Sequence, residues 1–170
     1  VRDASNSHHF VTMTSGFTAV TNSYMLGLLE DLKYYLGQSD FTSRFTQRYF
    51  DPEFKEGKDR DIHLYFDGLA EHSKTIRKEA VSRRLLRNMI EIYEEDNITY
   101  LEDRVDELIN YFKTQYPGKK DIPHVQKLKG MMREWEEELV WAFFGFNTSS
   151  VSHMRLGFYQ GDIFTENPEM

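Results

Sequence analysis

The chain has 170 residues, of which 21 are basic and 28 acidic, so its formal net charge is -7. It contains no cysteine, which excludes disulfide frameworks, thiolate metal sites and cysteine nucleophiles. The acidic balance disfavours non-specific binding to nucleic acid or to anionic lipid. No apolar run approaches the ~20 residues of a membrane-spanning helix, and the first ten residues lack the apolar segment of a secretory signal. We therefore expect a soluble, intracellular (cytoplasmic) protein.

The first half of the chain predicts helices separated by one charged loop. Only four prolines occur, and the long stretches between them favour helices. Apolar residues at helical spacing predict a helix over about 18–36 that ends at Gly37. A short helix capped by Asp40 follows, and the charged stretch 50–61 is predicted to be a surface loop.

The second half predicts longer helices and a short strand. The helices are predicted over about 61–72, 75–95, 100–115 and 124–145. Thr99 and Glu102 match a capping box, which places the start of the helix 100–115. Short β-prone runs occur at 10–14 and near 154–159.

These elements predict a single all-α domain over 1–170, with five to six helices packed in an irregular bundle. Aromatic residues make up 15% of the chain, and such residues supply much of the buried area in cores and interfaces. The segments 1–16 and 147–170 are predicted to be non-helical, extended tails.

An arginine-rich stretch lies within the helix predicted over 75–95. On a helical projection the apolar residues occupy one half of this helix and the arginines occupy the other. These arginines are Arg77, Arg83, Arg84 and Arg87. We interpret them first as a solvated helix face. The second interpretation is a patch that binds an anion or nucleic acid, because the planar guanidinium suits phosphate.

The end of the helix 124–145 is apolar on every side. The segment LVWAFFGF (139–146) places Val140, Trp141 and Phe144 on a half of the helix that is otherwise polar, whereas Phe143 falls on the apolar stripe. Either the terminal segments of the chain cover these side chains, or another chain does. Tryptophan and phenylalanine are common interface anchors. The predicted partner-binding residues are Val140, Trp141, Phe144 and Phe146.

Candidates for catalysis and metal binding are sparse. His63 and Asp67 lie four residues apart on a predicted helix and could offer two ligands to a metal. The simpler interpretation is a solvated face. The glutamates at 134 and 136–138 surround Trp135 and are also interpreted as solvated. No nucleophile elbow and no Glu-x-x-His pair occurs, so we expect no cofactor and favour a non-enzymatic role.

Together these features favour a protein–protein interaction or assembly subunit. It would be a structural or accessory component of a larger complex, and a viral or phage particle is one such complex. Its partner would be another protein or copies of itself. The alternative is a regulator that binds nucleic acid or a nucleoprotein through the arginine face, or that acts as an acidic mimic through 91–107. A third hypothesis is an enzyme or ligand-binding bundle with a pocket between helices.

Overall fold

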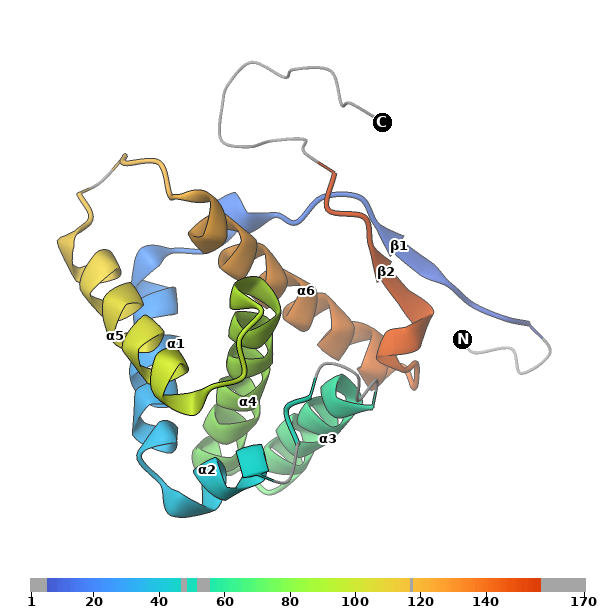
Figure 1. Ribbon diagram of the computed structural model, residues 1–170. Coiled ribbons are helices and arrows are strands. Elements are labelled where there is room, and N and C mark those ends of the chain that lie inside the picture. Colours follow the sequence, from blue (N-terminus) through green and yellow to red (C-terminus); the bar gives the residue numbers. More distant parts are fainter. Residues whose placement is uncertain (1–5, 47–48, 52–55, 117, 157–170) are drawn as a thin grey trace. The chain divides into compact units, whose positions relative to one another are not determined.

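The computed structural model describes residues 6–46, 49–51, 56–116 and 118–156. The all-α prediction is confirmed, since these residues form six α-helices and one pair of short strands (Figure 1). The helices are α1 (Asn22–Leu36), α2 (Ser39–Thr46), α3 (Gly57–Ala70), α4 (Lys74–Tyr93), α5 (Ile98–Thr114) and α6 (Pro123–Phe143). The strands are β1 (Phe10–Thr12) and β2 (Val151–His153), with single 3-10 turns η1 (Phe17–Ala19) and η2 (Thr148–Ser150).

The chain divides into two compact units. Unit 1 consists of the described residues within Val1–Val20 and Lys120–Met170, and unit 2 of those within Thr21–Lys119. Unit 1 therefore contains β1, η1, α6, η2 and β2, whereas unit 2 contains α1 to α5. The single domain over 1–170 stays a prediction.

The helix starts follow local capping signals. Thr21 caps α1, because its hydroxyl accepts the backbone N–H of Tyr24 at 3.2 Å. Ser73 caps α4 in the same way, with the backbone N–H of Ile76 at 3.3 Å. Each bond satisfies a donor that the first helical turn leaves without a partner. The predicted start at 75 is one residue from the observed start of α4, whereas the predicted start at 18 lies four residues before that of α1.

Two predicted caps are wrong. Asp40 lies inside the first turn of α2, which already begins at Ser39. Asn97 rather than Thr99 caps α5, because its side-chain oxygen accepts the backbone N–H groups of Thr99 and Tyr100 at 3.0 and 3.2 Å. Asparagine is among the preferred capping residues, and its short side chain reaches these donors from a position two residues earlier.

Two further boundaries differ from the prediction. The helix α3 begins at Gly57, so the end of the predicted loop 50–61 is helical, while 52–55 lies outside the described residues. The second strand is found at Val151–His153 instead of 154–159. Of that predicted run, 157–159 lies outside the described residues.

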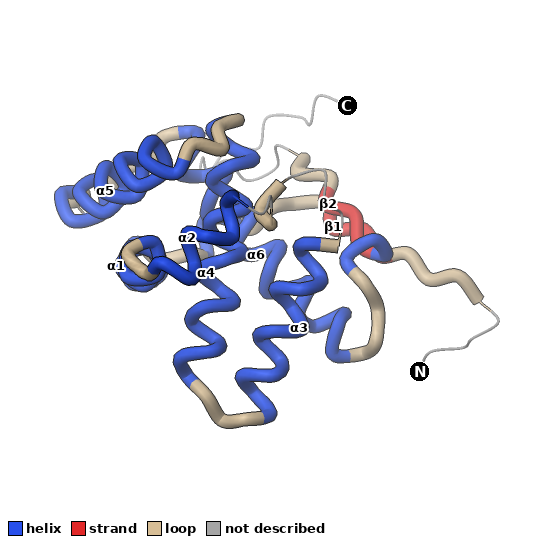
Figure 2. The backbone as a smooth tube through the Cα atoms, turned by 60° about the horizontal axis from the view of Figure 1, so that its bottom comes forward, coloured by secondary structure: helices blue, strands red, loops and turns tan. Residues whose placement is uncertain are grey.

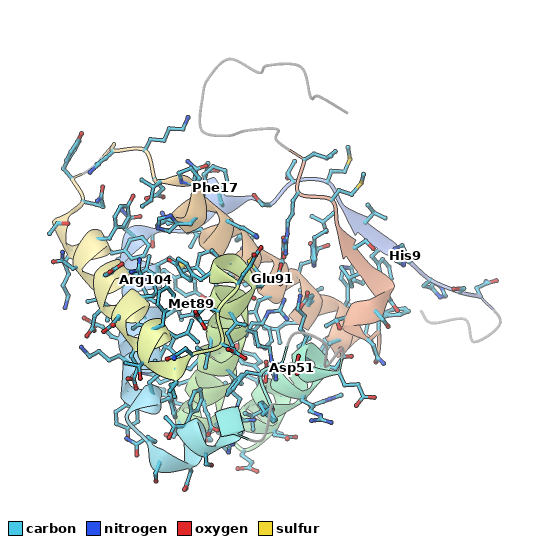
Figure 3. The ribbon with its side chains drawn as sticks, viewed as in Figure 1. His9, Phe17, Asp51, Met89, Glu91 and Arg104 are labelled. Atoms are coloured by element: carbon cyan, nitrogen blue, oxygen red, sulfur yellow. The ribbon has the colours of Figure 1, made fainter. Side chains whose placement is uncertain are left out.

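Unit 2 is built around α1 and α4. The helix α1 contacts α2, α4 and α5, and α3 pairs with α4 as a helical hairpin (Figure 2). Met89 of α4 is completely buried and lies among these helices (Figure 3). The other completely buried apolar side chains of this core are Met25, Leu29, Leu32, Ala80, Leu85, Leu86, Leu101 and Val105. Each large side chain of this kind contributes roughly 1.5–3 kcal/mol when it is removed from water.

The close contact between α3 and α4 depends on Gly68. A Cβ atom at this position would lie 2.9 Å from the backbone nitrogen of Arg77 and 2.8 Å from its Cγ. We expect Gly68→Ala to lower the free energy of unfolding by about 1–3 kcal/mol, because the backbone of α4 must move to admit the methyl group. Urea denaturation measures this change.

Gly27 in α1 provides the matched control. No described atom outside its own helical neighbourhood lies within 4 Å of a Cβ built there. Alanine has the better helix propensity, so Gly27→Ala should raise the free energy of unfolding by about 0.5–1 kcal/mol. If both substitutions stabilise the chain equally, the proposed steric role of Gly68 is wrong.

Unit 1 joins the two ends of the described chain. The strands β1 and β2 pair in parallel, with Phe10 opposite Val151 and Thr12 opposite His153. Parallel strands need a long crossover connection, and here the whole sequence of α1 to α6 lies between them. The helix α6 also contacts η1, where Phe17 lies beside it (Figure 3).

Candidate functional site

The C-terminal end of α6 forms an aromatic cluster with β1. The rings of Phe10 and Trp141 stack with their centroids 3.6 Å apart and their planes at 15°. Phe146 packs edge-on against both rings, at 4.9 Å from Phe10 and 6.3 Å from Trp141. Edge-on pairs such as those of Phe146 are favourable aromatic arrangements. The N-terminal segment therefore covers Trp141 and Phe146, two of the predicted partner-binding residues.

Three neighbouring side chains at the same helix end remain uncovered. Val140 is 53% exposed, Phe143 75% and Phe144 58%. The rings of Phe143 and Phe144 pack edge-on with centroids 5.6 Å apart. We call these three residues the α6 apolar end.

The assignment of Phe143 to the apolar, core-facing stripe of α6 is wrong. That stripe is buried at Val125, Leu128 and Trp135, but Phe143 at the last helical position is the most exposed of the large apolar side chains that are described. A periodic pattern identifies the apolar side of a helix. It does not show how far the neighbouring elements extend along that side.

Glutamates on α6 attach the strands to the helix. The hydroxyl of Thr12 donates a hydrogen bond to Glu137, and Trp141 Nε1 donates to the same carboxylate at 3.3 Å. His153 Nε2 lies 3.3 Å from Glu138 Oε1. Thr12 and His153 are opposite each other in the strand pair. Paired residues of neighbouring strands point to the same side of a sheet, so both face α6.

The interpretation of the glutamate run as solvated is wrong for two of its members. Glu134 and Glu138 are buried. Arg155, just after β2, donates two hydrogen bonds to Glu134, at 2.7 and 2.8 Å. Such a bidentate, charge-assisted pair is stronger than a neutral hydrogen bond and offsets the loss of hydration. These contacts hold both strands against α6. The α6 apolar end therefore belongs to a helix whose neighbouring segments are fixed to it.

Three of the four arginines that were predicted to form a solvated face of α4 are buried. Arg83 and Arg87 are more than nine-tenths buried, and Arg84 is completely buried. Arg87 Nε donates to Asp61 Oδ2 at 2.6 Å, whereas Arg83 donates to Glu79 and to the Tyr49 hydroxyl. The prediction assumed that the polar half of an amphipathic helix faces water. In the structure α3 and the rings of Tyr49 and Phe50 cover this half of α4.

Aromatic rings complete the arginine cluster. The guanidinium of Arg87 lies over the rings of Tyr49 and Phe50, at 5.0 and 5.2 Å from their centroids, and that of Arg83 lies 5.2 Å from the Tyr49 centroid. Cation–π contacts of this kind strengthen where water is excluded. Burial raises the pKa of the Asp61 carboxyl from 3.8 to about 6, although Arg87 acts in the opposite direction. The cluster is thus an internal ionic network of unit 2.

The remaining candidates are exposed or half-buried. Arg77 is half-buried near the start of α4, and its Nε donates to the Ser73 carbonyl at 3.4 Å. His63 and Asp67 both lie on the exposed side of α3. Among the described residues, no three His, Asp or Glu side chains come close enough to hold one metal ion. Within the same residues, no helix has the length and apolar character that crossing a bilayer requires.

Comparison with known proteins adds no functional information. No protein-family model, curated protein or solved structure matches the chain. Function therefore has to be inferred from the surfaces and cavities of the chain itself.

Proposed function

We propose that this chain is a non-enzymatic interaction or assembly subunit, a component of a larger complex, and that the α6 apolar end binds its protein partner. The observation that carries the proposal is the exposure of Val140, Phe143 and Phe144 side by side at one helix end. Contiguous exposed apolar side chains mark interaction sites, and aromatic residues are enriched at the centres of interfaces.

The neighbouring contacts support this assignment. Trp141 is stacked on Phe10, and Glu137 and Glu138 bind Thr12 and His153. A surface held in this way loses little conformational freedom when a partner binds, and pre-organisation of that kind favours affinity. The exposed rings themselves take no part in the buried core, so their removal leaves the fold intact.

The test is a double substitution, Phe143→Ser with Phe144→Ser. We expect the molar mass of the wild-type chain, from light scattering behind size exclusion, to rise above 20.2 kDa with concentration. The double variant should dissociate at least about 100-fold more readily, because each ring contributes roughly 1.5–3 kcal/mol when an interface buries it. Circular dichroism should show unchanged helix content.

Tyr34→Ser is the matched control, since Tyr34 is also a highly exposed aromatic residue but lies on α1. It should associate as the wild type does. Equal weakening in Tyr34→Ser would assign the association to general surface hydrophobicity and contradict the proposal. A wild-type mass of 20.2 kDa at every concentration would exclude self-assembly, and the partner would then be a different protein.

The nucleic-acid alternative has less support. It needs arginine side chains that can reach phosphate, whereas Arg83 and Arg87 donate to Glu79 and Asp61 inside unit 2. It stays a prediction, and binding to oligonucleotides at low salt would test it.

A further inference from the structure

A cavity of about 280 Å³ opens on unit 2 between α1, α3 and α4. Its apolar walls are formed by Tyr24 and Leu28 of α1, Tyr65 of α3 and Val81 of α4. Tyr24 and Leu28 are one helical turn apart, so their side chains lie on the same side of α1. Two aromatic rings with two aliphatic side chains form a surface that suits a flat apolar group.

Ser82 lines the same cavity and has an unusual environment. The residue is 1% exposed, and its hydroxyl has no hydrogen-bond partner among the described residues. Buried hydroxyl groups in folded proteins are almost always hydrogen-bonded, and a serine within a helix often bonds the carbonyl four residues earlier. The Ser82 hydroxyl is closed to solvent, so this residue adds a tightly packed side chain to the wall of the cavity.

Basic residues line the same cavity. Lys74, Arg77 and Lys78 occupy positions i, i+3 and i+4 of α4, so they are neighbours on its surface. Lys78 pairs with Asp31 at 2.7 Å. Neither Lys74 nor Arg77 has a carboxylate partner among the described residues, and the Arg77 side chain donates a hydrogen bond to the Ser73 carbonyl. The cavity therefore carries net positive charge, although the whole chain is acidic.

We infer that this cavity binds a small amphipathic anion, namely an apolar body about the size of one aromatic ring that carries a carboxylate or phosphate group. The rings of Tyr24 and Tyr65 would contact the apolar body, while Arg77 would bind the anionic oxygens. A guanidinium presents several donors in one plane, which match the geometry of both anionic groups. The volume is near the lower end of the ~300–1,000 Å³ that ligand sites have, so a small ligand fits.

This site is independent of the proposed function, because the α6 apolar end belongs to unit 1. The probes are phenylacetate and phenyl phosphate, titrated into the full chain and followed by backbone amide NMR shifts. Phenylacetamide tests the need for charge, and inorganic phosphate tests the need for the apolar body. We expect saturable shifts around Tyr24, Tyr65 and Ser82 with at least one aromatic anion. Its affinity should exceed those of phenylacetamide and inorganic phosphate by about tenfold.

Variants locate the binding. Arg77→Gln should weaken the affinity about tenfold, whereas Ser82→Ala should leave it almost unchanged, because the Ser82 hydroxyl is closed to a ligand. Ser82→Ala should leave the unfolding temperature unchanged or raise it, because it removes an unpartnered hydroxyl and improves helix propensity. Lys113→Gln is the charge-matched control, since this exposed lysine pairs with Glu30 away from the cavity. It should bind the probes as the wild type does.

Three results would overturn the inference. The first is the absence of saturable shifts with both aromatic anions. The second is an equal affinity for one of the two control probes. Equal affinity for phenylacetamide would show that binding does not need the charge, and equal affinity for inorganic phosphate would show that it does not need the apolar body. The third is an equal loss in Arg77→Gln and Lys113→Gln, which would show general attraction of anions to lysine and arginine.

Discussion

Replacing Arg87 by methionine is expected to lower the free energy of unfolding by about 3–5 kcal/mol at neutral pH. Asp61 is completely buried, and its Oδ2 accepts the hydrogen bond from Arg87 Nε at 2.6 Å. The variant leaves that carboxylate in the interior without the cation that compensates its charge. Methionine is long and flexible and fills most of the vacated space, so the lost charge rather than a cavity dominates. Urea denaturation followed by circular dichroism measures the change.

An exposed ion pair provides the control for Arg87→Met. Lys33 lies 2.5 Å from Asp106, and both side chains are mostly exposed. Lys33→Met should leave the free energy of unfolding almost unchanged, because water screens such pairs. The loss in Arg87→Met should also shrink at acidic pH, where Asp61 is protonated. An Arg87→Met variant as stable as Lys33→Met would show that the buried pair has no structural role.

The second expected result is a fall in stability as the pH rises from about 4 to about 6. Burial raises the pKa of Asp61 from 3.8 in its ordinary state to about 6 in the folded chain. Between these values the folded chain holds a proton that the unfolded chain has lost, so the free energy of unfolding decreases with pH. The stabilising contribution is complete below pH 3.8 and is lost as the pH passes about 6. Its size is about 3 kcal/mol, at 1.36 kcal/mol for each unit of pKa.

The substitution Asp61→Asn isolates this contribution, because its amide oxygen can still accept from Arg87 but no longer titrates. Relative to the wild type, the variant should gain about 3 kcal/mol between pH 4 and pH 7. Asp106→Asn, at an exposed carboxylate, should show no comparable gain. A difference between wild type and Asp61→Asn that is constant with pH would mean that folding does not raise the pKa of Asp61.

The helices could be predicted from local sequence because their causes are local. Apolar spacing in 75–95 and 124–145 identifies α4 and α6. The hydroxyls of Thr21 and Ser73 accept backbone N–H groups three residues later, which fixes the starts of α1 and α4. The errors at the helix ends also have a local cause. Asn97 and Thr99 are both residue types that cap helices well, and only the backbone conformation shows that Asn97 is the cap. The absence of cysteine likewise followed from the sequence alone.

The α6 apolar end could be predicted only in part. Val140 and Phe144 were identified because they interrupt the polar side of a helix, and both are exposed. Trp141 met the same criterion, but Phe10 covers it. That contact joins residues at opposite ends of the chain, and no spacing rule relates their positions.

What the sequence by itself determined is the identity of the helices and the apolar side of each, since both follow from periodicity within one element. Only the tertiary structure decided which charged groups are buried. Arg84 and Glu134 have polar positions on their helices but lie in the interior. The cavity beside Ser82 likewise exists because three helices meet there. Burial depends on neighbours that are distant in sequence, and a helical projection contains no information about them.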